Sequence, residues 1–390
     1  MLGTDCFVVA TARTPRGKGS PKGALHGVLP VELVAELLRV IAARGVRASE
    51  VDDVVIGCAT QVDDQGANLA RTATLVAGWD ARVPGATVNR FCASGLDAIG
   101  VAAARVRAGD AALVVAGGVE SVSRVPMLAD RGPLYGDPAI AARIGAVHMG
   151  VSADLIASLD GATRDACDAY ADASRRKARA ARPPPSLVPM HGLDRDELVG
   201  RDPDGELPPL FADRAADIAL ARARYPQVAA WRAVHTRGSS PQLADAAAVV
   251  ALADRATADR LGLPPRARVV ATATCAVDPV IMLTAGQLAA ERALARAGLA
   301  ARDVAVFEFA EAFAATCLRF MRAFDLDHER MNPNGGTIAR GHAFGATGAI
   351  LAIDVVDELA RRGARYGVAC VSGAAGLGSA IVLERIQARV

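Results

Sequence analysis

The sequence predicts an α/β protein built from two similar halves with one inserted segment. Three observations lead to this prediction: an internal repeat, an equal spacing of notable residues in the two halves, and a composition rich in small apolar residues. Hydrophobic residues make up 52% of the 390 residues, and aromatic residues only 4%. Such a composition suits helices that pack closely on a sheet whose two faces are both buried.

The repeat begins with two apolar strand patterns that end in turn residues, at 7–17 and at 268–280. Each is followed by a helical pattern and then by a short strand that an aspartate opens. The helical patterns cover 31–45 and 286–298, and the aspartates are Asp53 and Asp303. The same order of elements in both places predicts two similar α/β halves, each a mixed sheet with helices on its faces.

The spacing stays equal beyond the repeat itself. Cys92 lies 39 positions after Asp53, and His342 lies 39 positions after Asp303. Both stand in a glycine-containing turn that leads into an Ala-rich helix. We therefore expect equivalent positions to face one another across a pseudo-twofold axis, which would bring Cys92 and His342 to one central site. Chance similarity of two Ala-rich segments is the alternative, and the matching order and spacing argue against it.

The segment from about 120 to 245 interrupts the repeat. It contains a helical pattern at 167–182 and a helix-like run at 219–234. Insertions of this kind commonly form lids or ligand-binding arms. The chain is therefore expected to divide into a first half at 1–119 with 246–263, a loop domain at 120–245, and a second half at 264–390.

Several classes of protein are excluded by composition. A net charge of +2 without a long run of one sign argues against binding to nucleic acid. No apolar run reaches the roughly 18 residues of a membrane span, and the N-terminus lacks the pattern of a secretory signal. The seven cysteines form no CxxC pair and no metal-ligand spacing. These features predict a cytoplasmic protein without a structural metal.

Three residues are candidates for chemistry. Cys92 precedes a predicted helix, whose N–H groups and dipole would stabilise a thiolate, so we predict a nucleophile rather than a buried structural cysteine. His342 lies among five glycines, where it could take a proton from a thiol or simply bond to backbone. Cys370 opens a glycine-rich turn and could act as an acid–base group, with the N–H groups after it holding an oxyanion. A nucleotide loop is a weaker interpretation, because no P-loop lysine accompanies these glycines.

These blocks, in this order, resemble the thiolase family over the whole chain. VVATARTPRGK resembles its opening strand, NRFCASGLDAI its nucleophile block, HMGVSADLIA the start of its loop domain, NPNGGTIARGHAFGATGA its histidine block and CVSGAAGLGSAIVLE its C-terminal cysteine block. The resemblance implies two βαβαβαββ halves in a layered αβαβα arrangement. The inserted loop domain would bind substrate and CoA and make oligomer contacts.

The resemblance also implies roles for individual residues. Cys92 would take up the acyl group as a thioester, His342 would activate it, and Cys370 would move the proton at the α-carbon. The backbone N–H groups of Cys92 and Ser372 would form the oxyanion hole. The pantetheine and acyl pocket would be lined by His148, Met149 and Phe313.

The activity implied is that of an acyl-CoA thiolase, an acyltransferase. It would cleave 3-oxoacyl-CoA with CoA to acetyl-CoA and a shortened acyl-CoA, or run the reverse Claisen condensation. Coenzyme A would be a substrate, with no bound cofactor and no metal. A homodimer or homotetramer is expected, and the sequence around EFAEAF leans towards fatty-acid β-oxidation, with an enzyme of that process as a candidate partner subunit.

Four positions depart from the family pattern. Ala310 replaces an asparagine or histidine that holds a water near the enolate oxygen, and alanine cannot hold it. Ala343 replaces a proline, Pro241 a serine near the pantetheine arm, and Ala246 a glycine. An alternative function is therefore a catalytically impaired, thiolase-like acyl-CoA-binding or scaffold subunit. A condensing enzyme that uses another acceptor is a third interpretation.

Overall fold

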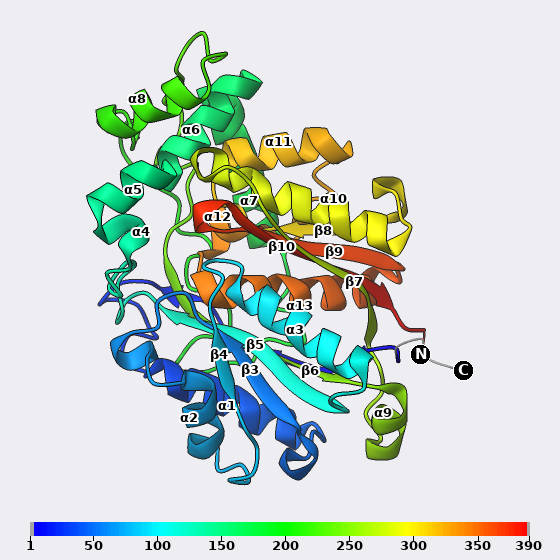
Figure 1. Ribbon diagram of the computed structural model, residues 1–390. Coiled ribbons are helices and arrows are strands. Elements are labelled where there is room, and N and C mark those ends of the chain that lie inside the picture. The colour runs from blue at the N-terminus through cyan, green and yellow to red at the C-terminus, as the bar shows by residue number, and fades with distance from the viewer. Residues whose placement is uncertain (1–3, 388–390) are drawn as a thin grey trace.

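The computed structural model describes residues 4–387, which form one ten-stranded sheet with helices on its faces (Figure 1). The strands are β1 (Phe7–Arg13), β2 (Gly17–Lys18), β3 (Asp53–Gly57), β4 (Ala86–Val88), β5 (Leu113–Ser121), β6 (Ala244–Ala253), β7 (Ala267–Ala276), β8 (Val306–Phe309), β9 (Tyr366–Ser372) and β10 (Leu377–Arg385). The helices are α1 (Pro30–Ala43), α2 (Leu69–Val76), α3 (Ser94–Ala108), α4 (Pro133–Gly136), α5 (Pro138–Ile144), α6 (Met149–Asp160), α7 (Arg164–Ala180), α8 (Ala215–Arg224), α9 (Arg255–Leu261), α10 (Ala285–Ala297), α11 (Ala314–Phe324), α12 (Thr337–Arg340) and α13 (Phe344–Arg362). Short 3-10 helices lie at η1 (Ala48–Glu50), η2 (Asp63–Gln65), η3 (Pro279–Thr284), η4 (Ala301–Asp303) and η5 (Ala374–Gly376).

The sheet consists of two similar parts joined edge to edge. The strand order is β4-β3-β5-β6-β1-β7-β10-β9-β8, with β2 paired to β6. In each part, the two pairings next to the junction of β1 and β7 are antiparallel. Beyond β5 in the first part and beyond β9 in the second, the pairing is parallel. The junction itself is short, because only Phe7 and Val8 pair with Arg268 and Ala267. The predicted α/β fold of two similar halves with an insertion is confirmed.

The two halves are stacked as five layers (Figure 1). Helices α1 and α2 cover the outer face of the first half, and α10 and α11 cover the outer face of the second. Helices α3 and α13 lie between the halves and contact strands of both. Successive side chains of a β-strand point to opposite faces of the sheet, so one strand contributes to two cores. In β5, Val114 and Ala116 belong to the middle core, whereas Leu113 and Val115 belong to the outer core.

Glycines allow the two central helices to touch at their first turns. A Cβ atom on Gly95 would lie 2.4 Å from the carbonyl oxygen of Gly345, and one on Gly348 would lie 2.6 Å from Cβ of Leu96. Both distances are too short for real side chains, so this contact requires glycine. It places the N-terminal ends of α3 and α13 together, and with them the segments that carry Cys92 and His342.

The inserted segment between β5 and β6 contains α4 to α8. Helices α6 and α7 pack against α11, so the insertion lies over the second half. The helix predicted at 167–182 is α7, whereas the run predicted at 219–234 is helical only as far as Arg224. Pro226 explains this early end, because proline has no N–H and clashes with the preceding turn.

One stretch of the described chain, Pro138–Asp160, is long and apolar enough to cross a membrane by composition. It is not one continuous helix: α5 ends at Ile144 and α6 begins at Met149. Gly145, with φ of +73°, caps α5 in the left-handed region that favours glycine. Much of α6 is buried against its neighbours, so this segment forms part of the core of the insertion.

Candidate active site

Cys92 lies in a tight turn between β4 and α3. Phe91 has a φ of +49°, and Ser94 fixes the turn by accepting the Arg90 N–H at 2.7 Å and donating to the Phe91 carbonyl at 2.6 Å. The Cys92 side chain is half-buried at a cavity. The cavity is lined by Ala59, Thr60, Phe91, Cys92, Met127, Leu128, Asp130, Tyr135, Met149, Phe344 and Ala374.

Hydrogen bonding to the backbone of Cys92 and of Ala374 favours the thiolate of Cys92 and lowers its pKa. Burial and the negative charge of Glu120 nevertheless outweigh this effect and raise the pKa of Cys92 to about 12. In the free protein the sulfur is therefore protonated. The position before a helix predicts a stabilised thiolate, and in the free protein desolvation opposes that stabilisation and is the larger effect.

His342 immediately precedes the turn into α13 and is almost fully buried. Its Nδ1 lies 2.8 Å from Oγ1 of Thr347, and its backbone N–H donates to the Gln242 carbonyl at 2.8 Å. Burial and the charge of Arg16 lower the pKa of His342 to about 3, so the ring is neutral. The ring meets Phe344 edge-on at 5.1 Å, and Phe344 lines the Cys92 cavity. The side chain of Phe344 thus lies between His342 and that cavity.

Glu120 connects the Cys92 side of the site to the His342 side. Its buried carboxylate accepts the N–H groups of Ala59 and Gly345, both at 2.9 Å, and the side-chain amide of Gln65 at 2.7 Å. Burial raises the pKa of Glu120, and these donors oppose the rise. Sequence reasoning did not single out this residue. The signal was available, because Glu120 follows seven apolar or glycine residues in β5 and stands just before its last residue, Ser121.

Cys370 lies outside the cavity. In β9 the side chains of Val368 and Cys370 enter the outer core beneath α10, whereas Ala369 and Val371 face the middle layer. Cys370 is fully buried, and burial together with the charge of Glu308 raises its pKa well above the ordinary value. Strand alternation thus packs this thiol in the outer core, and the acid–base role that the resemblance implies for Cys370 stays a prediction.

Ser372 follows the same alternation. Its hydroxyl donates to the Leu283 carbonyl at 2.7 Å and accepts the Gly286 N–H at 2.9 Å, which ties β9 to the start of α10. The backbone that hydrogen-bonds to Cys92 is that of Ala374, two residues later, because the chain leaves the strand after Ser372. The oxyanion pair of Cys92 and Ser372 stays a prediction, and the backbone of Ala374 is a further candidate donor beside Cys92.

Replacing Cys370 by alanine is a direct test of this geometry. We expect CoA-dependent cleavage within about twofold of the wild type, since the thiol does not reach the cavity, and a slightly lower melting temperature from the lost packing. Steady-state assays on acetoacetyl-CoA and a thermal melt measure both effects. A fall of a hundredfold or more at unchanged stability would place Cys370 in the acid–base chemistry after all.

Of the three predicted pocket residues, only Met149 lines the Cys92 cavity. His148 caps α6 by accepting the Gly150 N–H at 3.0 Å, and its ring lies 5.1 Å from that of Phe211. Burial is the main reason that the pKa of His148 is lowered. Phe313 packs against Phe211 and His235 in the core beneath α6. His148 and Phe313 therefore pack behind the cavity wall to which Met149 belongs.

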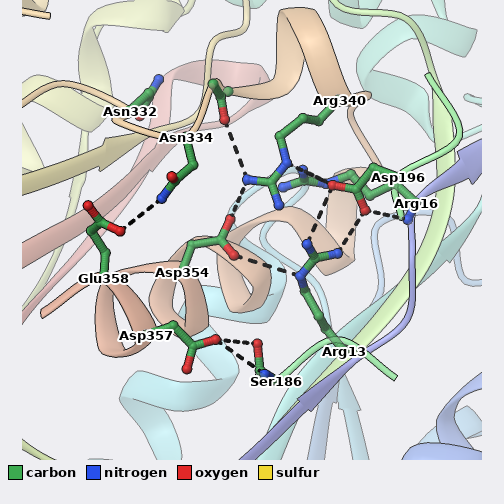
Figure 2. A network of polar contacts seen from close by, with 12 residues as sticks. Arg13, Arg16, Ser186, Asp196, Asn332, Asn334, Arg340, Asp354, Asp357 and Glu358 are labelled. Atoms are coloured by element: carbon green, nitrogen blue, oxygen red, sulfur yellow. Dashed lines mark hydrogen bonds and ion pairs between the residues drawn. The ribbon is translucent and has the colours of Figure 1, made fainter. Parts of the chain in front are cut away.

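A buried charge cluster holds the segment before His342 (Figure 2). The guanidinium groups of Arg13, Arg16 and Arg340 converge on the carboxylate of Asp196, with shortest distances of 2.8, 3.2 and 2.7 Å. Arg340 also contacts Asp354 of α13 at 2.8 Å. Burial alone would raise the pKa of Asp196, but the three arginines hold it well below its usual range. The cluster thus ties the insertion to β1, α12 and α13.

Of the four departures from the family pattern, the three alanines are buried and Pro241 is half-buried. Ala310 is in the middle core, and its N–H donates to the Cys370 carbonyl at 3.1 Å. Ala343 donates its N–H to Oγ1 of Thr347 at 3.1 Å. Ala246 lies within β6, opposite Glu120. Pro241 lies just before β6. Each alanine fits its place as a small core residue.

Comparison with known proteins agrees with this architecture. Residues 6–256 match the family "Thiolase, N-terminal domain", and residues 263–385 match "Thiolase, C-terminal domain". The chain is 36% identical to the "Beta-ketoadipyl-CoA thiolase" of Escherichia coli, over 98% of this chain and 100% of that protein. It is 34% identical to the "3-ketoacyl-CoA thiolase" of Bacillus subtilis (strain 168), over 97% and 99%.

A solved structure supports the same assignment. The acetyl-CoA acetyltransferase of Bacillus anthracis superposes with a TM-score of 0.83 at 30% identity and covers 99% of this chain and 100% of its own. The family matches extend over both halves and the insertion, and they include the blocks that carry Cys92, His342 and Ala374. The chain therefore belongs to the thiolase family of acyltransferases.

Proposed function

We propose that this protein is an acyl-CoA thiolase that acts through an acyl group carried on Cys92. It would cleave 3-oxoacyl-CoA with CoA to acetyl-CoA and a shortened acyl-CoA, or run the reverse condensation. The observation that supports this most is the Cys92 thiol at a cavity whose Phe344 meets the His342 ring edge-on at 5.1 Å. Relatives named β-ketoadipyl-CoA thiolase and 3-ketoacyl-CoA thiolase support the same class of substrate.

Acyl transfer to Cys92 needs a base and an oxyanion site. His342 is neutral and can accept the thiol proton as the sulfur attacks the 3-oxo carbon. Because the free thiol is a weak acid here, the proton leaves only as the carbonyl oxygen gains charge. The N–H groups of Cys92 and Ala374 would stabilise that charge. Collapse of the adduct breaks the bond between C2 and C3 and leaves the acyl group on sulfur.

The electron pair of the broken bond stays on the departing acetyl-CoA enolate, which needs one proton at carbon. Since Cys370 faces the outer core, His342 is the group in the predicted set that can return the proton taken from Cys92. In the second half His342 would take the CoA thiol proton, CoA would attack the thioester, and Cys92 would leave and recover that proton. One base thus serves both half-reactions.

The test of this function is CoA-dependent cleavage of acetoacetyl-CoA and of 3-oxohexanoyl-CoA by the purified protein, with acetyl-CoA measured as product. In parallel, intact-mass spectrometry after incubation with acetyl-CoA would detect an acetyl group on the protein, and peptide mapping would place it on Cys92. Cleavage together with this adduct supports the proposal. An adduct without cleavage would instead favour an impaired acyl-CoA-binding protein.

Replacing Ala374 by proline is expected to lower kcat by about 10²–10³-fold, because it removes one donor to the oxyanion. The backbone suits the change: Ala374 is the first residue of η5, and Gly373 before it is extended, with φ of −121° and ψ of 170°. Rates of acetoacetyl-CoA cleavage measure the effect, and Ala375→Ser in the same loop is the control. A variant with full kcat would remove Ala374 from the oxyanion site.

The pH dependence of kcat/KM is expected to be flat from about pH 5 to about pH 9, because kcat/KM reports the essential groups of the free enzyme. His342, with a pKa lowered to about 3, stays a neutral base throughout. Cys92, with a pKa raised to about 12, stays protonated. We expect activity to be lost below the pKa of His342 and above the pKa of Cys92. An inflection between pH 6 and 7 that His342→Asn abolishes would contradict this assignment.

Assembly and location are part of the proposal. We propose a cytoplasmic homodimer or homotetramer in which 120–245 is the loop domain for substrate and CoA. Four large apolar side chains are at least 40% exposed, namely Leu29, Leu75, Val101 and Leu128, which supports burial in an oligomer. Light scattering on the purified protein measures the mass, and a monomer at micromolar concentration would count against it. A fatty-acid oxidation partner stays a prediction that co-purification can test.

A further inference from the structure

The hydroxyl of Tyr135 is a polar group in the Cys92 cavity that the steps above do not use. Tyr135 lies in α4 of the insertion and lines the cavity together with Cys92. Its oxygen is buried and has no hydrogen-bond partner among the described residues. A buried hydroxyl left unpaired costs roughly 1–3 kcal/mol, so it calls for an explanation. One explanation is that a ligand in the cavity supplies the hydrogen-bond acceptor.

The Tyr135 hydroxyl is also near the reacting sulfur. Burial and, next, the charge of Cys92 raise the pKa of Tyr135 to about 12. The phenol is therefore protonated and can donate a hydrogen bond to a ligand in the pH range where the protein works. The donor thus belongs to the same cavity in which an acyl group attached to Cys92 would begin.

The rest of the cavity indicates which acyl groups fit. Five apolar side chains form most of the wall, namely Phe91, Met127, Leu128, Met149 and Phe344. No lysine, arginine or histidine is among the lining residues, and the charged residue there is Asp130, which is largely exposed. An acyl chain that ends in a carboxylate would lie near this aspartate without a cation, which is unfavourable. A neutral chain meets no such penalty.

The space beside the thiol is small. It amounts to about 40 Å³, room for about three water-sized groups. An acceptor that pairs with Tyr135 must therefore lie within a few atoms of the acyl carbonyl. A hydroxyl or keto oxygen on a short chain meets this condition.

We propose that Tyr135 determines acyl specificity: its hydroxyl donates a hydrogen bond to a neutral oxygen on a short acyl chain carried by Cys92. This inference rests on the proposed thiolase function. It also separates this protein from a relative named for β-ketoadipyl-CoA, whose acyl chain ends in a carboxylate. The difference concerns the acyl pocket alone, since the chemistry at Cys92 is the same for both kinds of chain.

Three CoA thioesters of equal chain length test the proposal: butyryl-CoA, 3-hydroxybutyryl-CoA and succinyl-CoA. The readout is the rate of acylation of Cys92, followed by rapid-quench mass spectrometry. The matching 3-oxo substrates, 3-oxohexanoyl-CoA, 5-hydroxy-3-oxohexanoyl-CoA and 3-oxoadipyl-CoA, give kcat/KM for cleavage. We expect the hydroxylated chain to be preferred over the apolar one by about tenfold, the factor that one hydrogen bond supplies. The carboxylated chain is expected to react most slowly.

Tyr135→Phe removes the hydroxyl and keeps the ring. It should lower the rate with the hydroxylated chain by about tenfold and leave the rate with the apolar chain within twofold. Tyr225→Phe, in the same insertion but outside the cavity lining, is the matched control and should change neither rate. A preference that survives in Tyr135→Phe overturns the inference. So does an equal loss with all three chains, which would indicate a structural role.

The two proposals fail in different ways. If the wild-type protein is acylated on Cys92 by all three thioesters at the same rate, the thiolase function stands and the role of Tyr135 is refuted. Fastest acylation by succinyl-CoA refutes it as well. If none of the three acylates Cys92 and no 3-oxo substrate is cleaved, the thiolase function itself is refuted and the inference about Tyr135 falls with it.

Discussion

Replacing Cys92 by alanine is expected to lower CoA-dependent cleavage by roughly 10⁴-fold or more and to abolish the acyl adduct. A nucleophile has no substitute in a mechanism that passes through a covalent thioester. The fold should survive, because Cys92 is half-buried and its turn is held by Ser94 through two hydrogen bonds. Steady-state rates with acetoacetyl-CoA, intact mass after acetyl-CoA, and a thermal melt measure the three effects.

Cys370→Ala is the matched control for this experiment, since it also removes one thiol but beneath α10. The two variants should differ by several orders of magnitude in rate although they differ little in stability. Equal losses in both would mean that the outer-core thiol takes part. A Cys92→Ala protein that still forms an acyl adduct would show that another of the seven cysteines carries the acyl group.

Replacing Asp196 by asparagine is expected to destabilise the protein by about 3–5 kcal/mol, the range found when one partner of a buried ion pair is removed. Asp196 is 3% exposed and accepts from Arg13, Arg16 and Arg340 (Figure 2). Asparagine carries no negative charge. The three buried guanidinium groups would then have Asp354 as the remaining carboxylate contact in the cluster. Urea unfolding and thermal melting measure the loss.

Activity should fall with stability in Asp196→Asn, because Arg340 is two residues before His342 and is held by Asp196 and Asp354. Asp259→Asn is the control: that carboxylate pairs with Arg255 on an exposed helix, where an ion pair contributes little. We expect no measurable change in its melting temperature. An Asp196→Asn protein with wild-type stability would show that the cluster is compensated by water or by rearrangement.

The sequence was most informative where a pattern repeats. Equal spacing from Asp53 to Cys92 and from Asp303 to His342 predicted that Cys92 and His342 would come to one central site. The helices that follow them, α3 and α13, touch at their first turns. The strand and helix patterns at the start of each half were likewise found within a few residues of their predicted bounds. Periodicity reports which face of an element is buried, and that is enough to order the layers.

The sequence was least informative at the ends of strands. Which residue after β9 hydrogen-bonds to Cys92 through its backbone depends on where the strand stops and on a φ of +56° at Ala375, neither of which composition reveals. Which way Cys370 points depends on the register of β9 within the sheet. Tyr135 was missed for another reason, since the insertion has no counterpart in the second half from which a role could be read.

The short junction of β1 with β7 has a consequence for the chain as a whole. Only two residue pairs join the two parts of the sheet, and neither half contains both Cys92 and His342. The chain passes between the halves through α9 and the segment that follows it. Neither of the two fragments produced by a cut there would be active alone, and turnover would return only when the fragments reassociate. Turnover therefore requires both halves in one assembled structure.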